Sequence, residues 1–380
     1  MKKIAIIGAS YLQLPLILKA REMGVETHVF AWAAGDVGER EADHFYPISI
    51  VERDRILKQC RRIGIDGICS IASDLAMLTV NYVAEQMGLV ANPMSATLVS
   101  TNKNLMRQRF AEMGDPSPRS LKVTSAADLD GLTLSFPLIV KPLDRSGSRG
   151  ITRITARDQL SGAIERAKAQ GFEKAALVEE FAEGVEYSVE GISWQGRHTI
   201  LAMTRKYTTG APGFIETGHI EPSGVDDVTF QRVLAITEHA LTSLGLAYGA
   251  SHTELKIDDQ GRIRLIEIGG RMGGDFIGST LVRLSTGIDF VRAVIEIALG
   301  RQPESLERKY GKAAAVRFVL CEEDLRVLEQ IRREAPELLY ESDVRPLDGH
   351  EVTDSSTRFG YYILHADRPE VLLKYMPPEQ

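Results

Sequence analysis

The chain has 380 residues, of which 44% are hydrophobic and 26% charged, and its formal net charge at pH 7 is −7. This length predicts two or three domains, and the composition excludes collagen-like, low-complexity and strongly disordered proteins. The negative balance gives no sign of non-specific nucleic-acid binding, and no segment approaches the roughly 18 consecutive apolar residues of a membrane span. The three cysteines follow no disulfide or zinc spacing, so we expect reduced thiols in a cytoplasmic protein.

The segment 1–93 alternates short apolar runs with helical patterns. We expect strands at Lys3–Gly8, Val25–Trp32 and Gly67–Ile71, and helices at Gln13–Met23, Arg55–Arg62 and Leu75–Met87. This alternation predicts a parallel sheet with helices on both faces. The turn after Gly8 lacks the second and third glycines of the dinucleotide fingerprint, so we do not expect NAD binding.

A second pattern begins after the Asn92-Pro93 break. Helices are expected at Asn102–Met113, Arg157–Gln170, Thr229–Leu244 and Asp289–Leu299, and strands at Phe136–Lys141, Ala176–Glu180, Glu186–Ser193, His198–Thr204, Ser251–Asp259 and Arg262–Ile268. The stretch Tyr207–Gly224, rich in Thr, Gly and Pro, is expected to be a loop. The tail from Ala313 mixes strand and helix patterns without a motif; completion of the core, coverage of a site and dimerisation all stay open.

A lysine precedes a loop of small residues in the central region. Lys141 ends an apolar strand, and the loop Ser146–Gly150 follows it closely. Such a loop can turn several backbone N–H groups towards one set of phosphate oxygens, and the lysine adds positive charge. The loop is not a Walker A sequence, and a surface hairpin with a solvated lysine is the alternative.

Two glutamates carry a sharper signal. If Gln260-Gly261 is a two-residue turn, counting back along both strands places Glu254 opposite Glu267. Directly opposed residues of an antiparallel pair project on the same face, so both carboxylates would reach one cation such as Mg²⁺. A slip of one residue would separate them, and two exposed strand glutamates are the alternative.

Four glycines surround Arg271 directly after the second glutamate, in the stretch 267–275. Glycines permit close approach of the backbone to a ligand, and arginine can bind a carboxylate or phosphate through two hydrogen bonds. A surface ion pair is the alternative for Arg271.

Taken in order, these motifs resemble those of the ATP-grasp carboxylate–amine ligases, over roughly residues 1–300. The resemblance implies an α/β protein. It would have an N-terminal parallel-sheet domain (1–93), a two-lobed α+β nucleotide-binding fold (94–312, with a lid lobe at about 117–183) and a small C-terminal α/β extension (313–380).

The resemblance also implies a role for each matching residue. The nucleotide phosphates would be bound by Lys103 and Lys141, and a loop of Ser146, Gly147, Ser148 and Gly150 would close over them. Adenine would be held by Glu179, Phe181 and Ala182, and the ribose by Glu186. The metal would be bound by Glu254 and Glu267, and Arg271 would stabilise an acyl-phosphate. One departure concerns Gly269, because the family often has a metal-binding Asn there. Water or Asp275 could fill that place.

The implied reaction joins a small-molecule carboxylate, activated by ATP, to an amine, with Mg²⁺ or alternatively Mn²⁺ as the ion. We expect an amino acid among the substrates. A purine-pathway or carboxylase-type enzyme that activates bicarbonate or formate is one alternative, and a non-catalytic nucleotide-binding regulator is another. A homodimer stays open.

Two further residues concern the substrates. His219, in the stretch that resembles the acceptor side of amino-acid ligases together with Thr209 and Glu216, is predicted to orient or deprotonate an amine. A hydrogen-bonded loop histidine is the alternative. Asp74 follows a strand at the sheet end where open α/β sheets place ligands, so it would meet an ammonium group or cap the helix that starts at Leu75.

Overall fold

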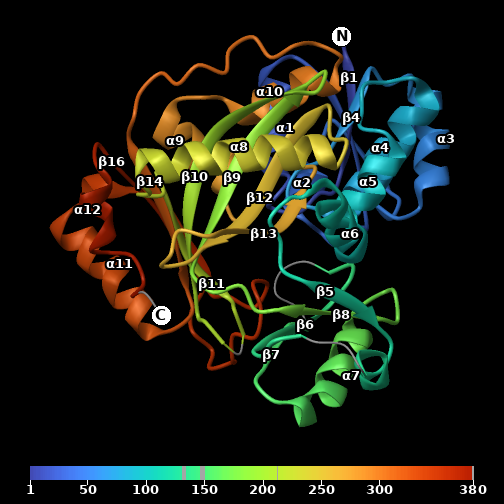
Figure 1. Cartoon of the computed structure of the whole chain (residues 1–380). Helices are drawn as coiled ribbons and strands as arrows, with labels where there is room; N and C mark the ends of the chain where they lie inside the picture. The colour runs from blue at the N-terminus through green and yellow to red at the C-terminus, as the bar shows by residue number, and fades with distance from the viewer. Residues whose placement is uncertain (131–133, 146–149, 212, 379–380) are drawn as a thin grey trace.

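The amino-terminal part of the chain forms a parallel sheet (Figure 1). The computed structural model describes residues 1–130, 134–145, 150–211 and 213–378. The strands are β1 (Lys3–Ile7), β2 (Glu26–Ala31), β3 (His44–Pro47) and β4 (Gly67–Cys69), in spatial order β3-β2-β1-β4, and the helices are α1 (Leu14–Glu22), α2 (Val37–Glu41), α3 (Arg53–Ile63), α4 (Asp74–Met87) and α5 (Met94–Thr101). The parallel sheet confirms the expectation for this segment, whereas β3, α2 and α5 were not predicted.

The strands β1, β2 and β4 are buried on both faces, as their short apolar runs require, whereas the edge strand β3 is partly exposed. On β1, Ile4 and Ile6 belong to one core with α1 and α10 (Phe290–Ala298), whereas Ala5 and Ile7 belong to another with α3 and α4. Successive side chains of a strand point to opposite faces, so helices cover the sheet on both sides.

A small lobe follows, below the rest of the molecule in Figure 1. It holds the antiparallel strands β5 (Ser120–Val123), β6 (Leu138–Pro142), β7 (Thr152–Ile154) and β8 (Ala176–Glu180), in spatial order β5-β8-β6-β7, with α7 (Leu160–Gln170) and the short turns Ala126–Leu129 and Arg157–Gln159. The helix α7 packs on one face of this sheet through Leu160, Ala163 and Ile164. The other face of the small sheet is therefore directed towards the large sheet.

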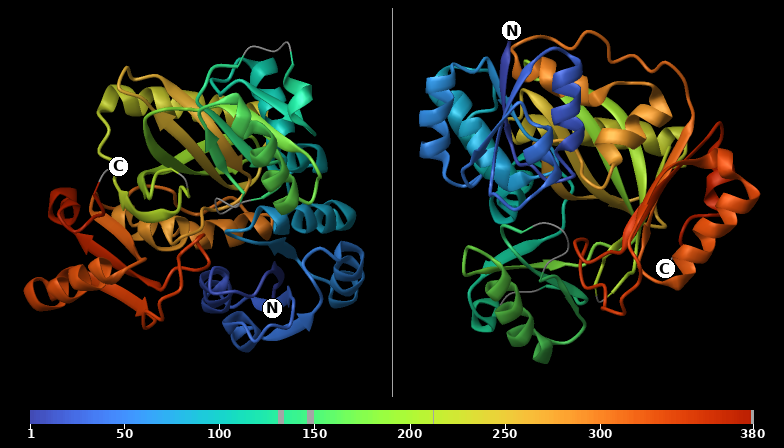
Figure 2. Two further views of the ribbon diagram at one scale, coloured as in Figure 1. Left: turned by 90° about the horizontal axis from the view of Figure 1, so that it is seen from below. Right: turned by 180° about the vertical axis from the view of Figure 1, so that it is seen from behind.

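The large sheet has eight described strands, all paired antiparallel with their neighbours. They are β9 (Val185–Trp194), β10 (Arg197–Thr208), β11 (Glu216–Glu221), β12 (Gly249–Ile257), β13 (Ile263–Gly269), β14 (Ala313–Val319), β15 (Leu339–Val344) and β16 (Gly360–Ala366), in spatial order β13-β12-β9-β10-β11-β14-β16-β15. The helices α6 (Lys103–Met113) and α8 (Asp227–Ser243) share one core with it, and α10 shares another. Figure 2 shows these layers from two further sides.

The sheet corrects one expectation and decides another. The stretch predicted as a loop contains β11, because its Thr, Gly and Pro content hid a short strand that pairs with both β10 and the distant β14. The C-terminal strands β14, β15 and β16 extend the same large sheet. The tail therefore completes a core, together with α9 (Val282–Thr286), α11 (Glu322–Glu334), α12 (Pro369–Leu373) and the short segments Ile277–Leu281 and Pro336–Leu338. Among the described residues, no helix is both long and apolar enough to pass through a bilayer.

Glu221, the last residue of β11, is a fully buried carboxyl group. Thr204 Oγ1 donates to its Oε1 at 2.7 Å, and Ser285 Oγ donates to its Oε2 at 2.8 Å. Burial raises the pKa of this carboxyl from 4.5 to about 7, against the opposing effect of the two hydrogen bonds. The folded protein therefore holds a proton that the unfolded chain releases at a lower pH.

This shift predicts a pH-dependent effect of Glu221→Gln. The stability of the parent should fall as pH rises through the window from 4.5 to about 7, because its folded state binds one more proton there than its unfolded state. We expect the free energy of unfolding of the variant to exceed that of the parent at pH 8 by up to ~3 kcal/mol, and the two values to differ little near pH 5. Urea unfolding at the two pH values measures this difference. An equal effect at both would show that Glu221 is ionised throughout.

Candidate functional site

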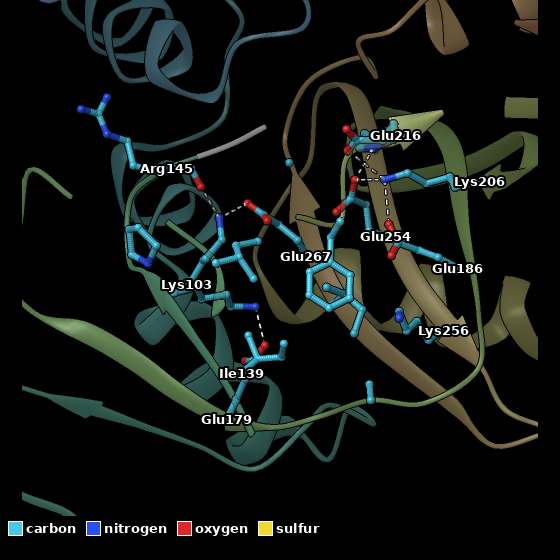
Figure 3. A pocket seen from close by; sticks show the side chains of 18 of the residues that line it. Lys103, Ile139, Arg145, Glu179, Glu186, Lys206, Glu216, Glu254, Lys256 and Glu267 are labelled. Atoms are coloured by element: carbon cyan, nitrogen blue, oxygen red, sulfur yellow. Dashed lines mark hydrogen bonds and ion pairs between the residues drawn. The ribbon is translucent and has the colours of Figure 1, made fainter. Parts of the chain in front are cut away.

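A cleft lies between the small lobe and the large sheet (Figure 3). Its lining includes Lys103, Lys141, Arg145, Glu179, Phe181, Ala182, Glu186, Lys206, Glu216, His252, Glu254, Glu267, Gly269 and Arg271. Most of the predicted site residues thus meet in one place, although they come from both lobes and from α6. His219 and Gly150 are not part of this lining, and Ser146, Gly147 and Ser148 lie outside the described residues.

The two predicted acids pair across neighbouring strands. Glu254 on β12 is opposite Glu267 on β13, which confirms the expected register. The expected two-residue turn is wrong, however, because Asp258 N–H donates to Arg262 O at 3.2 Å and closes a loop of one residue more. A β-bulge between Glu254 and Leu255 in this pairing, with Ile266 as the extra residue, restores the register.

Cations lie directly on both acids. Lys103 Nζ is 2.7 Å from Glu267 Oε1, and Lys206 Nζ is 2.6 Å from Glu254 Oε1 and 2.9 Å from Glu186 Oε1. Burial opposes the charge of Lys206, but the surrounding carboxylates outweigh it and raise its pKa well above the usual value. Burial also opposes ionisation of Glu254, and Lys206 nevertheless holds the pKa of that carboxyl well below its usual range. No sequence pattern indicated Lys206, because both phases of β10 are buried around it.

This donor set fits a hard divalent cation. Two carboxyl groups on adjacent strands offer oxygen ligands, which Mg²⁺ and Mn²⁺ prefer. The lysines on Glu254 and Glu267 show that the acids need a positive partner in the cleft. Both groups are oxygen donors, so neither of them favours a softer metal ion.

Lys141, Glu179 and Arg107 form a buried ionic group at the base of the cleft. Lys141 Nζ contacts Glu179 Oε1, and Arg107 Nε donates to Glu179 Oε2 at 3.1 Å. Burial opposes ionisation of Glu179, but Arg107 and Lys141 hold its pKa below the usual value. Burial lowers the pKa of Lys141, and the nearby Arg107 and Lys103 lower it further against the effect of Glu179. The Glu179 side chain thus holds two cations, a role that the sequence did not predict.

Arg107 also explains the bulge. Its Nη2 donates at 2.7 Å to the carbonyl oxygen of Ile266, the extra residue of β13. One guanidinium therefore connects Glu179 of the small lobe with the backbone distortion that aligns Glu254 and Glu267. Sequence reasoning missed Arg107, because its partners lie 72 and 159 residues away.

The connection between β8 and β9 supplies the remaining nucleotide candidates. Phe181 and Ala182 lie in it, and Phe181 N–H donates to Pro137 O at 3.0 Å. Glu186 stands at the start of β9 with its carboxylate on Lys206. Gly150 has a left-handed φ of +70°, a conformation that favours glycine. Their contacts with a nucleotide stay predictions.

A second connection links Glu254 to the glycine-rich loop. His252 Nδ1 contacts Glu190 Oε1, and Glu190 Oε2 accepts from Gly273 N–H at 3.0 Å. The other ring nitrogen, Nε2, is 3.3 Å from Glu254 Oε1. Burial opposes the charge of His252, but Glu190 raises its pKa to about 9. The histidine therefore orients Glu254 and the loop together, although sequence analysis did not single it out.

Arg271 binds a residue of the N-terminal part. Its Nη2 donates to Asp74 Oδ2 at 2.8 Å. Ser73, not Asp74, caps α4, since its side chain accepts from Ala76 N–H, so the capping role expected for Asp74 is wrong. Asp74 Oδ1 is buried and has no hydrogen-bond partner in the described part of the chain.

The same geometry accounts for Gly269. A Cβ at that position would come within 2.7 Å of Asp74 Oδ1 and 3.0 Å of Arg271 Cζ. A side chain at 269 is therefore excluded by the ion pair, and an Asn could not be accommodated without moving it. Asp275, the substitute that the sequence suggested, instead receives Arg358 Nη2 at 3.0 and 2.9 Å on its two oxygens.

The structure places His219 on β11, buried, with Nε2 3.8 Å from Asp275 Oδ2 and its ring edge-on to Phe318. Burial lowers the pKa of this imidazole. It is therefore not a loop residue, and its predicted contact with an amine remains a prediction. Glu216, by contrast, reaches the cleft and accepts from Ser355 Oγ of the C-terminal segment at 2.8 Å.

Comparison with known proteins agrees with this geometry. Residues 134–279 match the ATP-grasp domain family. The chain contains an ATP-grasp domain. The acids Glu254 and Glu267, the buried Lys141 and the connection between β8 and β9 fall within the matched range, whereas Lys103 precedes it.

Curated relatives of this chain include several ligases. Alanine–anticapsin ligase of Bacillus subtilis (strain 168) is 30% identical over 58% of this chain and 51% of its own length. Carnosine synthase 1 of Mus musculus is 24% identical over 80% and 40%. D-Alanine–D-alanine ligase of Chromohalobacter salexigens is 26% identical over 64% and 74%. The chain spans about half the length of the first of these relatives.

Solved structures show the fold of the whole chain. The L-amino acid ligase from Bacillus licheniformis has a TM-score of 0.84 and 23% identity, covering 99% of this chain and 96% of that one. The phosphoribosylglycinamide synthetase from Anaerococcus prevotii has a TM-score of 0.78 and 19% identity, covering 98% and 96%. These likenesses establish the ATP-grasp fold that the sequence resemblance implied.

Proposed function

We propose that the protein is an ATP- and Mg²⁺-dependent ligase that activates a carboxylate as an acyl-phosphate and joins it to an amine, with an amino acid among its substrates. One observation carries this proposal: the opposed acids Glu254 and Glu267 share a cleft with two buried lysines, Lys103 and Lys141, and with the partly buried Arg271. The names of the relatives support the choice of an amino acid.

The residues divide into groups that bind and groups that stabilise charge. Lys103 and Lys141 would bind phosphates, while the backbone of Phe181 and Ala182 would bind adenine and Glu186 the ribose. Mg²⁺, when bound, would supply positive charge between Glu254 and Glu267 and the phosphates. Nucleotide entry must then displace Lys103 from Glu267 and Lys206 from Glu186 and Glu254. Positioning and charge neutralisation of this kind are the main requirements of phosphoryl transfer.

Two chemical steps follow from this arrangement. A carboxylate oxygen attacks the γ-phosphorus of ATP, the bond to the β-phosphate oxygen breaks, and ADP leaves. The amine nitrogen then attacks the acyl carbon, the carbon–oxygen bond to phosphate breaks, and the nitrogen loses a proton. Arg271 would stabilise the negative charge that develops on the acyl group, because its guanidinium is held by Asp74 at the cleft wall.

We further propose that Asp74 compensates for the absent side chain at Gly269 by fixing Arg271. This predicts an interaction between the two positions. In the parent, Gly269→Asn should lower kcat/KM strongly, because its Cβ would meet Asp74 Oδ1 at 2.7 Å. In an Asp74→Ala background, the fold-loss of kcat/KM caused by Gly269→Asn should be smaller by a factor of at least about ten. Steady-state kinetics of the single and double variants measures the coupling. Independent, additive effects would contradict the proposed exchange.

The activity itself is tested by ADP release from Mg²⁺-ATP across amino acids and other small carboxylates, alone and in pairs, with hydroxylamine as a trap. We expect one carboxylate to give ADP and a hydroxamate, and one amine to increase the rate. Stimulation by bicarbonate or formate alone would identify the carboxylase-type alternative. Nucleotide binding without any stimulated ADP release would identify a regulator.

A further inference from the structure

Two histidines and a glutamate meet on the N-terminal sheet, outside the cleft. Glu26 and His28 are two residues apart on β2, so they point to the same face. His44 is the register partner of His28 on the edge strand β3. The ligand atoms of all three side chains lie within 4.8 Å of one another.

The two imidazoles converge on one oxygen. His28 Nε2 is 3.0 Å and His44 Nε2 is 3.3 Å from Glu26 Oε1, and the rings stack with centroids 4.7 Å apart. Nitrogen and oxygen ligands of one tetrahedral zinc ion, bound at about 2.1 Å, are roughly 3.4 Å apart. These distances suit one ion, but the two rings are nearly parallel, so the half-exposed His44 ring must turn before both lone pairs point at it.

His28 supplies an independent sign of a missing ligand. It is 3% exposed, and its Nε2 has no hydrogen-bond partner among the described residues, although it lies 3.0 Å from Glu26 Oε1. The other nitrogen, Nδ1, is 3.1 Å from Tyr46 Oη. If Nδ1–H donates to that hydroxyl, the lone pair of Nε2 is left for a metal, as in many histidine sites.

We propose that Glu26, His28 and His44 bind a transition-metal ion of the Zn²⁺ class that fastens the edge strand β3 to β2. Two imidazoles and one carboxylate form a ligand set that zinc accepts, with water completing the shell on the side of His44, whose side chain is 51% exposed. The site would be structural, because it lies near the amino ends of β2 and β3, whereas Asp74 of the cleft follows the carboxyl end of β4 in the same parallel sheet.

One nearby charge opposes the ion. Lys3 is the register partner of Glu26 on β1, and its Nζ donates to Ile63 O at 3.3 Å. That hydrogen bond holds the ammonium on the carboxyl end of α3. Glu26 remains the negative group in contact with both imidazoles.

Zinc binding by the full chain tests the proposal, using ZnCl₂ in calorimetry and metal analysis after gel filtration, without nucleotide. We expect the parent to bind one zinc ion that raises its melting temperature. His44→Ala and Glu26→Gln should each lower the affinity for this ion at least tenfold. Co²⁺ at the same site should give the visible absorption of a low-coordinate ion, and His44→Ala should remove it.

His350→Ala is the matched control, because His350 is also an exposed histidine beside a carboxylate, Asp348. It should retain the ion and the Co²⁺ absorption. Zinc bound equally by the parent and His44→Ala would place the ion elsewhere, for example at Glu254 and His252, and would overturn the proposal. A parent that binds no zinc would do the same and leave the proposed ligase activity untouched.

Discussion

Glu267→Ala should reduce ADP formation by roughly a thousandfold while leaving the protein folded. The change removes one of the two opposed acids, and loss of a metal ligand costs several kcal/mol of transition-state stabilisation, where each ~1.4 kcal/mol is tenfold in rate. Nucleotide affinity without metal should hold or rise, because Lys103 loses its carboxylate partner and keeps only the carbonyl oxygen of Arg145. Stopped assays at saturating Mg²⁺ measure the rate.

Glu323→Ala is the control for this variant, since Glu323 is an exposed glutamate on α11 that contacts Arg326. It should have parental activity. Turnover of Glu267→Ala near the parental rate at high Mg²⁺ would contradict the assignment of Glu267 to the metal.

Lys141→Ala should weaken nucleotide binding by about 10- to 100-fold. The side chain is buried at the cleft base, and removing one partner of a desolvated charge pair costs about 2–5 kcal/mol, part of which Arg107 recovers by remaining on Glu179. Calorimetry with a non-hydrolysable ATP analogue measures the affinity. The shift in melting temperature that the analogue produces should shrink in parallel.

Lys122→Ala provides the comparison, because Lys122 is a partly exposed lysine of the same lobe, paired with Glu173. Its nucleotide affinity should match the parent. Unchanged affinity in folded Lys141→Ala would exclude Lys141 from phosphate binding. A loss of stability alone, with the analogue still stabilising the variant fully, would assign Lys141 a structural role beside Glu179.

Much of the fold could be predicted from the sequence, because local patterns decide it. Buried parallel strands read as short apolar runs, so the N-terminal sheet was expected from the sequence alone. The pairing of Glu254 with Glu267 was also predicted, but the turn was one residue too short and the bulge at Ile266 compensated for it. The correct pair thus came from a count that missed both features.

The errors concern contacts made over long stretches of sequence. The bulge at Ile266 is held by Arg107, 159 residues earlier, and no local pattern reports that bond. The strand that carries His219 depends on β14 for one of its partners, so a stretch rich in turn residues became a strand. Asp74 meets Gly269 and Arg271 only because the N-terminal part packs on the large sheet.

Transfer of oxygen from the carboxylate to phosphate tests the central claim most directly. A carboxylic substrate labelled with ¹⁸O in both oxygens would be incubated with the amine, Mg²⁺ and ATP, and the released phosphate analysed by mass. The acyl-phosphate route predicts one labelled oxygen in each phosphate, one ADP per amide, and neither product with Glu267→Ala. Unlabelled phosphate, or AMP and pyrophosphate as products, would contradict activation of the carboxylate by the γ-phosphate.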